Sequence, residues 1–469
     1  MSDNDDSEVE LCSLLESHLP KSSIRYRLIN LVSQSKKSKP IFYKNKNTTK
    51  STTVKIQHFI SILQDKVIFF GIEVFVYIIL DKDETSRVLF ISKADTTGLF
   101  DKDKTQDKIN VNIGELVKDI MKYLLRIPLS YYLDDVIVKL EKDKNIKHEF
   151  SFSNKFNNNR YVTSTERSLR ILIERLHQNK DINKPLKTEG NNRISHLKLE
   201  YNDNHVVDKI CLFTRPERQY LFPYSYKNTK KHLLNGEQLL KWWCNIINEV
   251  SLTEFDNKEI KLTIPGSEFT TTERYLPNKT NWSIGDIFHD NNHKDSNHEL
   301  AINAIPLFPD DPKGRFFEHL VVENRIKKIS ILQFWLELSI RQEFRLGVVV
   351  GVIGVKGNLH KKNFSNTNEL IKLNNKNLKK LKTIIIEQDY SNDIDEIEKI
   401  YNYINCLSIN HIFKEIHGKK LGKLEKQNHQ ANTIIPQTND LNGLVKRKLS
   451  SPTVNNLNGL VKRRKKPIL

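Results

Sequence analysis

Apolar residues recur along this chain with the two periods typical of strands and helices. The longest apolar run, Val67–Leu80, carries Glu73 as its one charged residue and is rich in β-branched and aromatic side chains. Such a run is typical of a buried strand. Shorter runs of the same kind predict a mostly antiparallel sheet, with strands at residues 24–32, 40–43, 54–63, 67–80, 87–92, 196–201, 209–214, 258–265 and 346–355.

Apolar residues three and four positions apart predict the helices. Residues 113–127 show the pattern with Ile113, Leu116, Ile120 and Leu124 on one face. Further helices are predicted at residues 7–18, 164–178, 235–250, 330–342, 366–384 and 394–416.

The stretch from Phe213 to Trp243 combines features that suit a phosphate-bearing ligand. An arginine-bearing turn is followed by an aromatic run and a basic cluster, comprising Tyr220, Phe222, Tyr224, Tyr226, Lys227, Lys230, Lys231 and His232. A helix then begins at Asn235, a good N-cap, and Gln238 completes a capping box. Lysines before a helix N-terminus attract phosphate, and aromatic walls can hold an apolar arm or an adenine ring. The alternative is a surface helix whose Trp242 and Trp243 pack into a core.

Two polar segments are candidates for reacting groups. Residues 93–100, KADTTGLF, form a tight turn at a strand end, where site residues often lie; a plain Asx or Thr turn is the alternative. In residues 303–320, prolines bracket Asp310 and Asp311, with Lys313 close by. We expect the prolines to stiffen this loop and keep it non-helical, which suits positioning of an incoming amine. The alternative is that its charges pair with one another.

No metal site and no membrane segment are expected. His289, His293 and His298 fit no tetrahedral frame and have no cysteine support, so a solvated loop is predicted there. The four cysteines are scattered, which favours a reducing compartment. The acidic N-terminus is not a secretory signal, and the 14 residues of Val67–Leu80 are too short to span a bilayer. A soluble, intracellular protein is therefore expected.

The charge is concentrated at the C-terminal end of the chain. The net charge is +18 over 469 residues, which favours an acidic partner such as nucleic acid, a charged cofactor or an acidic protein. From residue 418 onward, 12 Lys or Arg and 2 acidic residues give a local charge of +10. The repeats LNGLVKRK and LNGLVKRR predict a nuclear import signal. The alternatives are a contact with nucleic acid, a contact with an acidic chaperone, and a merely solvated tail.

Four blocks resemble one protein family. KADTTGL (93–99), LFTRPERQYLFPYSYKNTKKHLLNGEQLLKWW (212–243), IPLFPDDPKGRF (305–316) and FWLELSIRQEF…GVVVGVIG (334–354) are similar to fungal histone H3 lysine acetyltransferases of the regulator-of-Ty-transposition family. The resemblance implies an α/β (α+β) fold of the CREB-binding-protein type, with a central mixed, mostly antiparallel sheet surrounded by helices. It also implies acetyl-coenzyme A as co-substrate, in a tunnel. The phosphate loop of the GNAT acetyltransferases is absent from the sequence.

The resemblance also implies roles for individual residues. Asp311 matches the active-site acid with Asp310 beside it, Trp243 matches a tryptophan needed for turnover, and Tyr220 lines the tunnel. Lys313 matches a lysine that the enzyme itself acetylates. Expected cofactor contacts are Ala94, Asp95, Thr96, Phe213, His232, Leu233, Leu234 and Trp242. A substrate ammonium must lose a proton before it attacks, so Asp311 either positions the amine or removes the proton. Residues 216–219 depart from the family pattern.

The implied substrate is histone H3 in the H3–H4 pair, at a core-proximal lysine and at tail lysines. Implied partners are the anti-silencing H3–H4 chaperone and a NAP-type chaperone, in nuclear, replication-coupled nucleosome assembly that supports genome stability. The expected domains are an acetyltransferase domain at 1–417, with its core at 20–355 and a helical extension at 356–417, and a basic disordered tail at 418–469. A non-catalytic basic protein that binds chromatin or nucleic acid is the competing interpretation.

Overall fold

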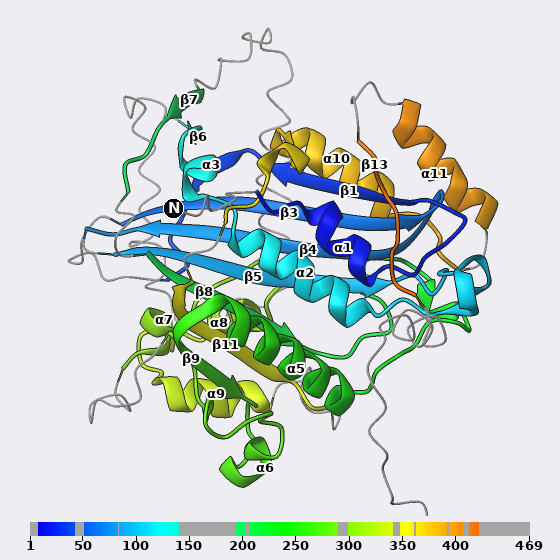
Figure 1. Ribbon diagram of the computed structural model, residues 1–469. Coiled ribbons are helices and arrows are strands. Elements are labelled where there is room, and N and C mark those ends of the chain that lie inside the picture. Colours follow the sequence, from blue (N-terminus) through cyan, green and yellow to red (C-terminus); the bar gives the residue numbers. More distant parts are fainter. Residues whose placement is uncertain are drawn as a thin grey trace, which may run out of the picture. The chain divides into compact units, whose positions relative to one another are not determined.

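Three long strands form the centre of the sheet in this computed structural model (Figure 1). β3 (Thr52–Gln64), β4 (Val67–Leu80) and β5 (Thr85–Thr96) pair in sequence as an antiparallel meander. β4 has the predicted bounds, and β3 and β5 extend the predicted strands. Side chains of β4 are buried on both faces of the sheet, which explains a continuous apolar run in place of an alternating one.

The structure describes residues 8–42, 51–82, 84–139, 194–201, 206–288, 299–340, 348–360, 363–391, 394–406 and 412–421. The sheet order is β10-β9-β11-β8-β5-β4-β3-β2-β6-β7, and β1 pairs with β3, β12 and β13. The other strands are β1 (Tyr26–Ser33), β2 (Ser35–Ser38), β6 (Val136–Lys139), β7 (Ile194–Leu197), β8 (Val206–Thr214), β9 (Phe255–Thr263), β10 (Trp282–Ile284), β11 (Gly351–Leu359), β12 (Ile371–Leu373) and β13 (Lys414–Ile416). Most pairs are antiparallel, but β5 and β8 are parallel, so the predicted mixed sheet is confirmed.

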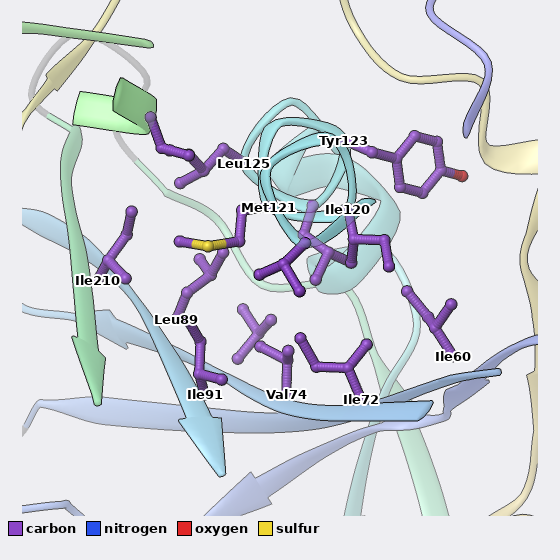
Figure 2. Packing of buried hydrophobic residues seen from close by; sticks show 14 of the residues in the cluster. Ile60, Ile72, Val74, Leu89, Ile91, Ile120, Met121, Tyr123, Leu125 and Ile210 are labelled. Carbon is purple, nitrogen blue, oxygen red and sulfur yellow. The ribbon is translucent and has the colours of Figure 1, made fainter. Parts of the chain in front are cut away.

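Two helices, α2 (Ile113–Leu125) and α5 (Gly236–Glu254), cover one face of the sheet (Figure 1). Figure 2 shows Ile72 and Val74 of β4 and Ile91 of β5 pointing toward Ile120 and Met121 of α2. This is the main hydrophobic core, and it places the N-terminal half of α5 beside the ends of β5 and β8.

The remaining helices are α1 (Leu11–His18), α3 (Leu129–Leu133), α6 (Phe269–Glu273), α7 (Ala301–Ala304), α8 (Pro312–Val322), α9 (Ile331–Ser339), α10 (Asn375–Ile386) and α11 (Ile394–Cys406). α1 and α3 also pack into the main core, whereas α7 to α11 form two further cores. α10 and α11 pack against β1 and β3 around Ile29, Leu31 and Phe59. α7, α8 and α9 gather around Phe334. β12, α10, α11 and β13 all contact strands of the sheet.

Several predicted boundaries are wrong. Residues 40–42 form no strand; β2 lies just before them, and Ile41 packs against aromatic residues instead. The segment around Pro312 was expected to be non-helical but starts α8. α10 begins at Asn375 because residues 371–373 pair with β1, and α11 ends at Cys406. The helix predicted at 164–178, His289–His298 and the tail repeats lie outside the described residues.

Candidate active site

A fork between two parallel strands opens the main cavity. β5 and β8 pair as far as Ile91 and Leu212, after which β5 stays with β4 and β8 stays with β11. An extra residue, Ser92, forms a β-bulge there, because Ile91 pairs with Val74 and Lys93 pairs with Glu73. Bulges bend a strand, so β5 diverges from β8. The fork leads into a cavity of about 610 Å³, a volume in the range of small-molecule sites.

The cavity wall is mostly apolar and aromatic. Apolar side chains from β4, β5, β8, α5 and the loop before α2 line it, including Phe69, Phe70, Ile91, Phe100, Val111, Leu212, Leu239 and Trp242. Every residue predicted to contact the cofactor also lines it, namely Ala94, Asp95, Thr96, Phe213, His232, Leu233, Leu234 and Trp242, together with Tyr220 and Trp243. The structure therefore brings these scattered residues together, and their functional roles remain predictions.

Trp242 and Trp243 of α5 serve both predicted purposes, packing into the core and lining a ligand cavity. Their rings meet edge to face with centroids 4.9 Å apart. Trp243 is buried in the main core and also lines the cavity. Their position follows from the start of α5, where the Asn235 side chain accepts from Gln238 N and the capping box is complete. Core packing thus fixes an aromatic wall of the cavity.

Asp95 holds the cavity wall together. Its Oδ2 accepts hydrogen bonds from the backbone N–H groups of Tyr220 at 2.8 Å and Leu221 at 3.0 Å. Its Oδ1 lies 2.7 Å from Nζ of Lys231, and the two side chains are 5% and 4% exposed. Lys231 also donates to Ser225 Oγ. The predicted contacts of Asp95 and Lys231 with a cofactor therefore compete with bonds inside the protein.

Other basic side chains also line the cavity. Lys102, Lys230 and His232 line it and are exposed. The backbone N–H groups of Asn235 and Gln238 are both bonded within the capping box, so fewer α5 amides are open to phosphate than the sequence suggested. Lys102 was not singled out, because it stands in a polar loop with no pattern of its own.

Asp311 is a buried helix cap. Its Oδ1 accepts a hydrogen bond from Lys313 N at 3.0 Å, and Pro312 is the first residue of α8. Proline is favoured at that position because it has no N–H to satisfy there and its φ already suits a helix. Oδ2 lies 2.5 Å from Nζ of Lys313, and the Asp311 and Lys313 side chains are 0% and 4% exposed. The alternative that the loop charges pair with one another is therefore realised here.

Asp310 is exposed, unlike its neighbour Asp311. It adopts a left-handed backbone conformation with φ 55°, and its carboxylate lies 2.9 Å from Nζ of Lys93. The hydrogen bond from Lys93 lowers the pKa of Asp310 below its usual value. Asp310 is therefore an ionised group at the surface, joined to the cavity wall through Lys93.

Phe213 lines the cavity and also lies near the buried Asp311–Lys313 pair, which is called the Asp311 corner below. Its side chain lines the cavity, and Lys313 Nζ lies 5.8 Å from the centre of its ring. Tyr220 lies on the same wall, and burial raises the pKa of its phenol, which therefore stays protonated and can donate a hydrogen bond. Asp310, Asp311 and Lys313 are not among the cavity-lining residues.

Within the described residues no group of three or more His, Cys, Asp or Glu side chains could hold a metal ion. The same part of the chain contains no helix with the length and apolarity needed to cross a bilayer.

Comparison with known proteins assigns the family. A model of the histone acetyltransferase KAT11-type domain matches residues 11–452. The chain belongs to this family of histone acetyltransferases. It is therefore an acetyltransferase enzyme, of a family that uses acetyl-coenzyme A as co-substrate and acts on histones.

Individual relatives agree with this assignment. Histone acetyltransferase RTT109 of Candida albicans is 35% identical over 67% of this chain and 78% of its own length. Histone acetyltransferase rtt109 of Schizosaccharomyces pombe is 32% identical over 30% of this chain and 39% of its own. The crystal structure of Rtt109 from Aspergillus fumigatus matches with a TM-score of 0.58 at 18% identity, over 88% of this chain and all of that one. The resemblance seen in the four sequence blocks is confirmed.

Proposed function

We propose that this KAT11-type enzyme transfers the acetyl group of acetyl-coenzyme A to lysines of histone H3, at core-proximal and tail positions, within the H3–H4 pair. One observation carries the proposal: a cavity with an aromatic wall and several lysines in its lining shares Phe213 with a buried Asp311–Lys313 pair. A dry slot for a thioester thus lies beside a carboxylate that can receive an amine.

Acetyl-coenzyme A would lie in the fork between β5 and β8. Beyond Ile91 and Leu212 the facing backbone edges of the two strands are no longer paired with each other, so their polar groups can bond the amides of the pantetheine arm. Lys102, Lys230 and His232 suit the phosphates at the other end. Ala94, Thr96, Leu233, Leu234 and Trp242 would contribute contacts along the cavity wall. The co-substrate supplies the acetyl thioester.

Asp311 would act on the incoming amine. A lysine ammonium has a pKa near ~10.4 in water and must lose its proton before it attacks the thioester carbon. Asp311 can hold the ammonium in place, or accept the proton directly or through water, and Tyr220 can donate to the developing oxyanion. Trp243 would keep water from the reacting atoms. The departing thiolate of coenzyme A takes up a proton.

Lys313 would control access to Asp311. Its ammonium, 2.5 Å from Asp311 Oδ2, occupies the position where a substrate ammonium has to bind. Acetylation of Lys313 by the enzyme itself removes that charge and frees the carboxylate. A Lys313→Gln variant would therefore have a lower KM for histone than the wild type, and a Lys313→Arg variant would have a higher one.

The remaining expectations are proposals supported by family membership and charge. The enzyme would act in the nucleus, with the anti-silencing H3–H4 chaperone and a NAP-type chaperone, in nucleosome assembly. The basic segment after residue 418 would provide the import signal and a contact for DNA or an acidic chaperone. Residues 1–417 would be the catalytic domain, although Lys420 still bonds to Leu19 and Lys21.

The test is acetyl transfer from labelled acetyl-coenzyme A to H3–H4, with and without the anti-silencing chaperone. Asp311→Asn is the decisive variant, because asparagine keeps the helix cap and removes the charge. Asp134→Asn, at an exposed ion pair with Lys198, is the matched control. We expect chaperone-stimulated transfer that collapses only in Asp311→Asn. Transfer that survives in Asp311→Asn would remove that residue from its role. No transfer by a folded wild-type protein, with salt-dependent DNA binding, would favour the non-catalytic chromatin-binding alternative.

A further inference from the structure

One ion pair joins the cavity wall to the Asp311 corner. Lys93 lies on β5 and lines the cavity, whereas Asp310 directly precedes the cap of α8. The Lys93 ammonium is 2.9 Å from the Asp310 carboxylate, and the two side chains are 29% and 70% exposed. Residues more than two hundred positions apart are thus linked at the place where co-substrate and substrate have to meet.

The bulge at Ser92 directs Lys93 toward this contact. Ile91 faces the core beneath α2 together with Val74. In a regular strand, Lys93 would face the same side, because side chains two residues apart share a face. The extra residue instead pairs Lys93 with Glu73 and turns its side chain to the opposite face, where Asp310 lies.

The alternative carboxylate is already engaged. Glu73 stands directly across from Lys93 but bonds to Lys382 and to Gln57. It is also almost fully buried. Lys93 therefore pairs with Asp310, the carboxylate that stands next to Asp311.

Asp310 needs external support to keep its conformation. Its φ of 55° lies in the left-handed region, which costs a non-glycine residue on the order of 1 kcal/mol or more. This turn carries the chain directly into Asp311, the N-cap of α8. A shift of the Asp310 backbone therefore moves the start of α8 and, with it, the Asp311 carboxylate.

We propose that Lys93 is a positioning residue that holds Asp310 and thereby sets the place of the Asp311 carboxylate relative to the cavity. The proposal rests on the acetyl transfer proposed above. Displacement of a reacting group by about 1 Å can cost about 100-fold in rate. Loss of the Lys93 ammonium would therefore lower kcat while the cavity keeps its affinity for acetyl-coenzyme A.

The experiment compares Lys93→Met, Lys93→Arg, Asp310→Asn and the Lys93→Met/Asp310→Asn double variant. Lys198→Met is the matched control, because its ammonium pairs with Asp134 at 3.1 Å on the surface. We expect kcat to fall about 10- to 100-fold in Lys93→Met and in Asp310→Asn, with unchanged acetyl-coenzyme A affinity. Lys93→Arg should restore turnover, and the double variant should be no slower than the slower single one.

Hydrogen exchange gives a readout that does not depend on turnover. The hydrogen bond to Asp311 protects the Lys313 N–H from exchange. The exchange rate of this N–H should therefore be higher in Lys93→Met than in Lys198→Met. The proposal is overturned if Lys93→Met keeps wild-type kcat and exchange, or if it weakens acetyl-coenzyme A binding while Asp310→Asn does not. Absence of transfer by the wild type would instead count against the proposed function, and the exchange comparison would still test the positioning role.

Discussion

Replacing Asp95 with Asn tests whether one buried carboxylate holds the cavity wall. Asparagine is nearly the same size and keeps one acceptor oxygen, but it leaves the Lys231 ammonium without its counter-charge. The Asp95 and Lys231 side chains are 5% and 4% exposed, so the small energies of surface ion pairs do not apply. Breaking a buried pair from one side costs about 3–5 kcal/mol, and we expect a loss of unfolding free energy in that range.

Urea unfolding measures the effect, with Lys231→Met and the double variant as partners in a cycle. The double variant has no unpaired buried ammonium, so it should be more stable than Asp95→Asn alone. Asp134→Asn, at an exposed pair, should lose less than about 1 kcal/mol. The reasoning is refuted if Asp95→Asn loses under about 1 kcal/mol, or if the effects of the two single changes simply add.

Two further predictions concern the core and the cavity rim. Burial lowers the pKa of His58 to about 3, whereas a histidine in the unfolded chain has a pKa of about 6.5. As the pH falls below about 6.5, only the unfolded chain takes up this proton, so the free energy of unfolding decreases. In His58→Gln the loss of unfolding free energy between pH 7 and pH 5 should be about 2 kcal/mol smaller; an unchanged loss would contradict this. Gly98 has φ 77° and a side chain there would meet Lys231 at 2.7 Å, so Gly98→Ala should lose more than about 1 kcal/mol and weaken acetyl-coenzyme A binding. At Gly314 an added Cβ would meet nothing within 4 Å, so Gly314→Ala should leave the free energy of unfolding unchanged or raise it when both variants are unfolded in urea. Equal effects of the two changes would argue against the steric reason.

Elements with a strong local pattern could be predicted from the sequence. β4 was predicted with its bounds, and α2 and α5 nearly so, because continuous apolar runs and capping residues act within one segment. The residues around the cavity could be grouped only through the family resemblance, since they come from segments far apart in the chain.

Features that depend on tertiary contacts could not be predicted. The start of α8 was missed because Pro312 was taken as a helix breaker, although the first helical turn accepts proline. The Asp95–Lys231 pair joins residues 136 positions apart, and the local sequence around each residue does not indicate its partner. Likewise, the Ser92 bulge depends on the register with β4, which the alternation within one strand does not reveal.

The pairing of β1 with β13 has a consequence for synthesis of the chain. Arg25, just before β1, bonds to Glu415 in β13, 390 residues later. At about 5–20 residues per second, a ribosome needs roughly 20–80 seconds to supply that partner after β1 has emerged. During this time the nascent β1 exposes an unsatisfied edge that can pair with other chains. Long-range closure of this kind slows folding, so we expect β1 to complete its pairing only after β13 has been made.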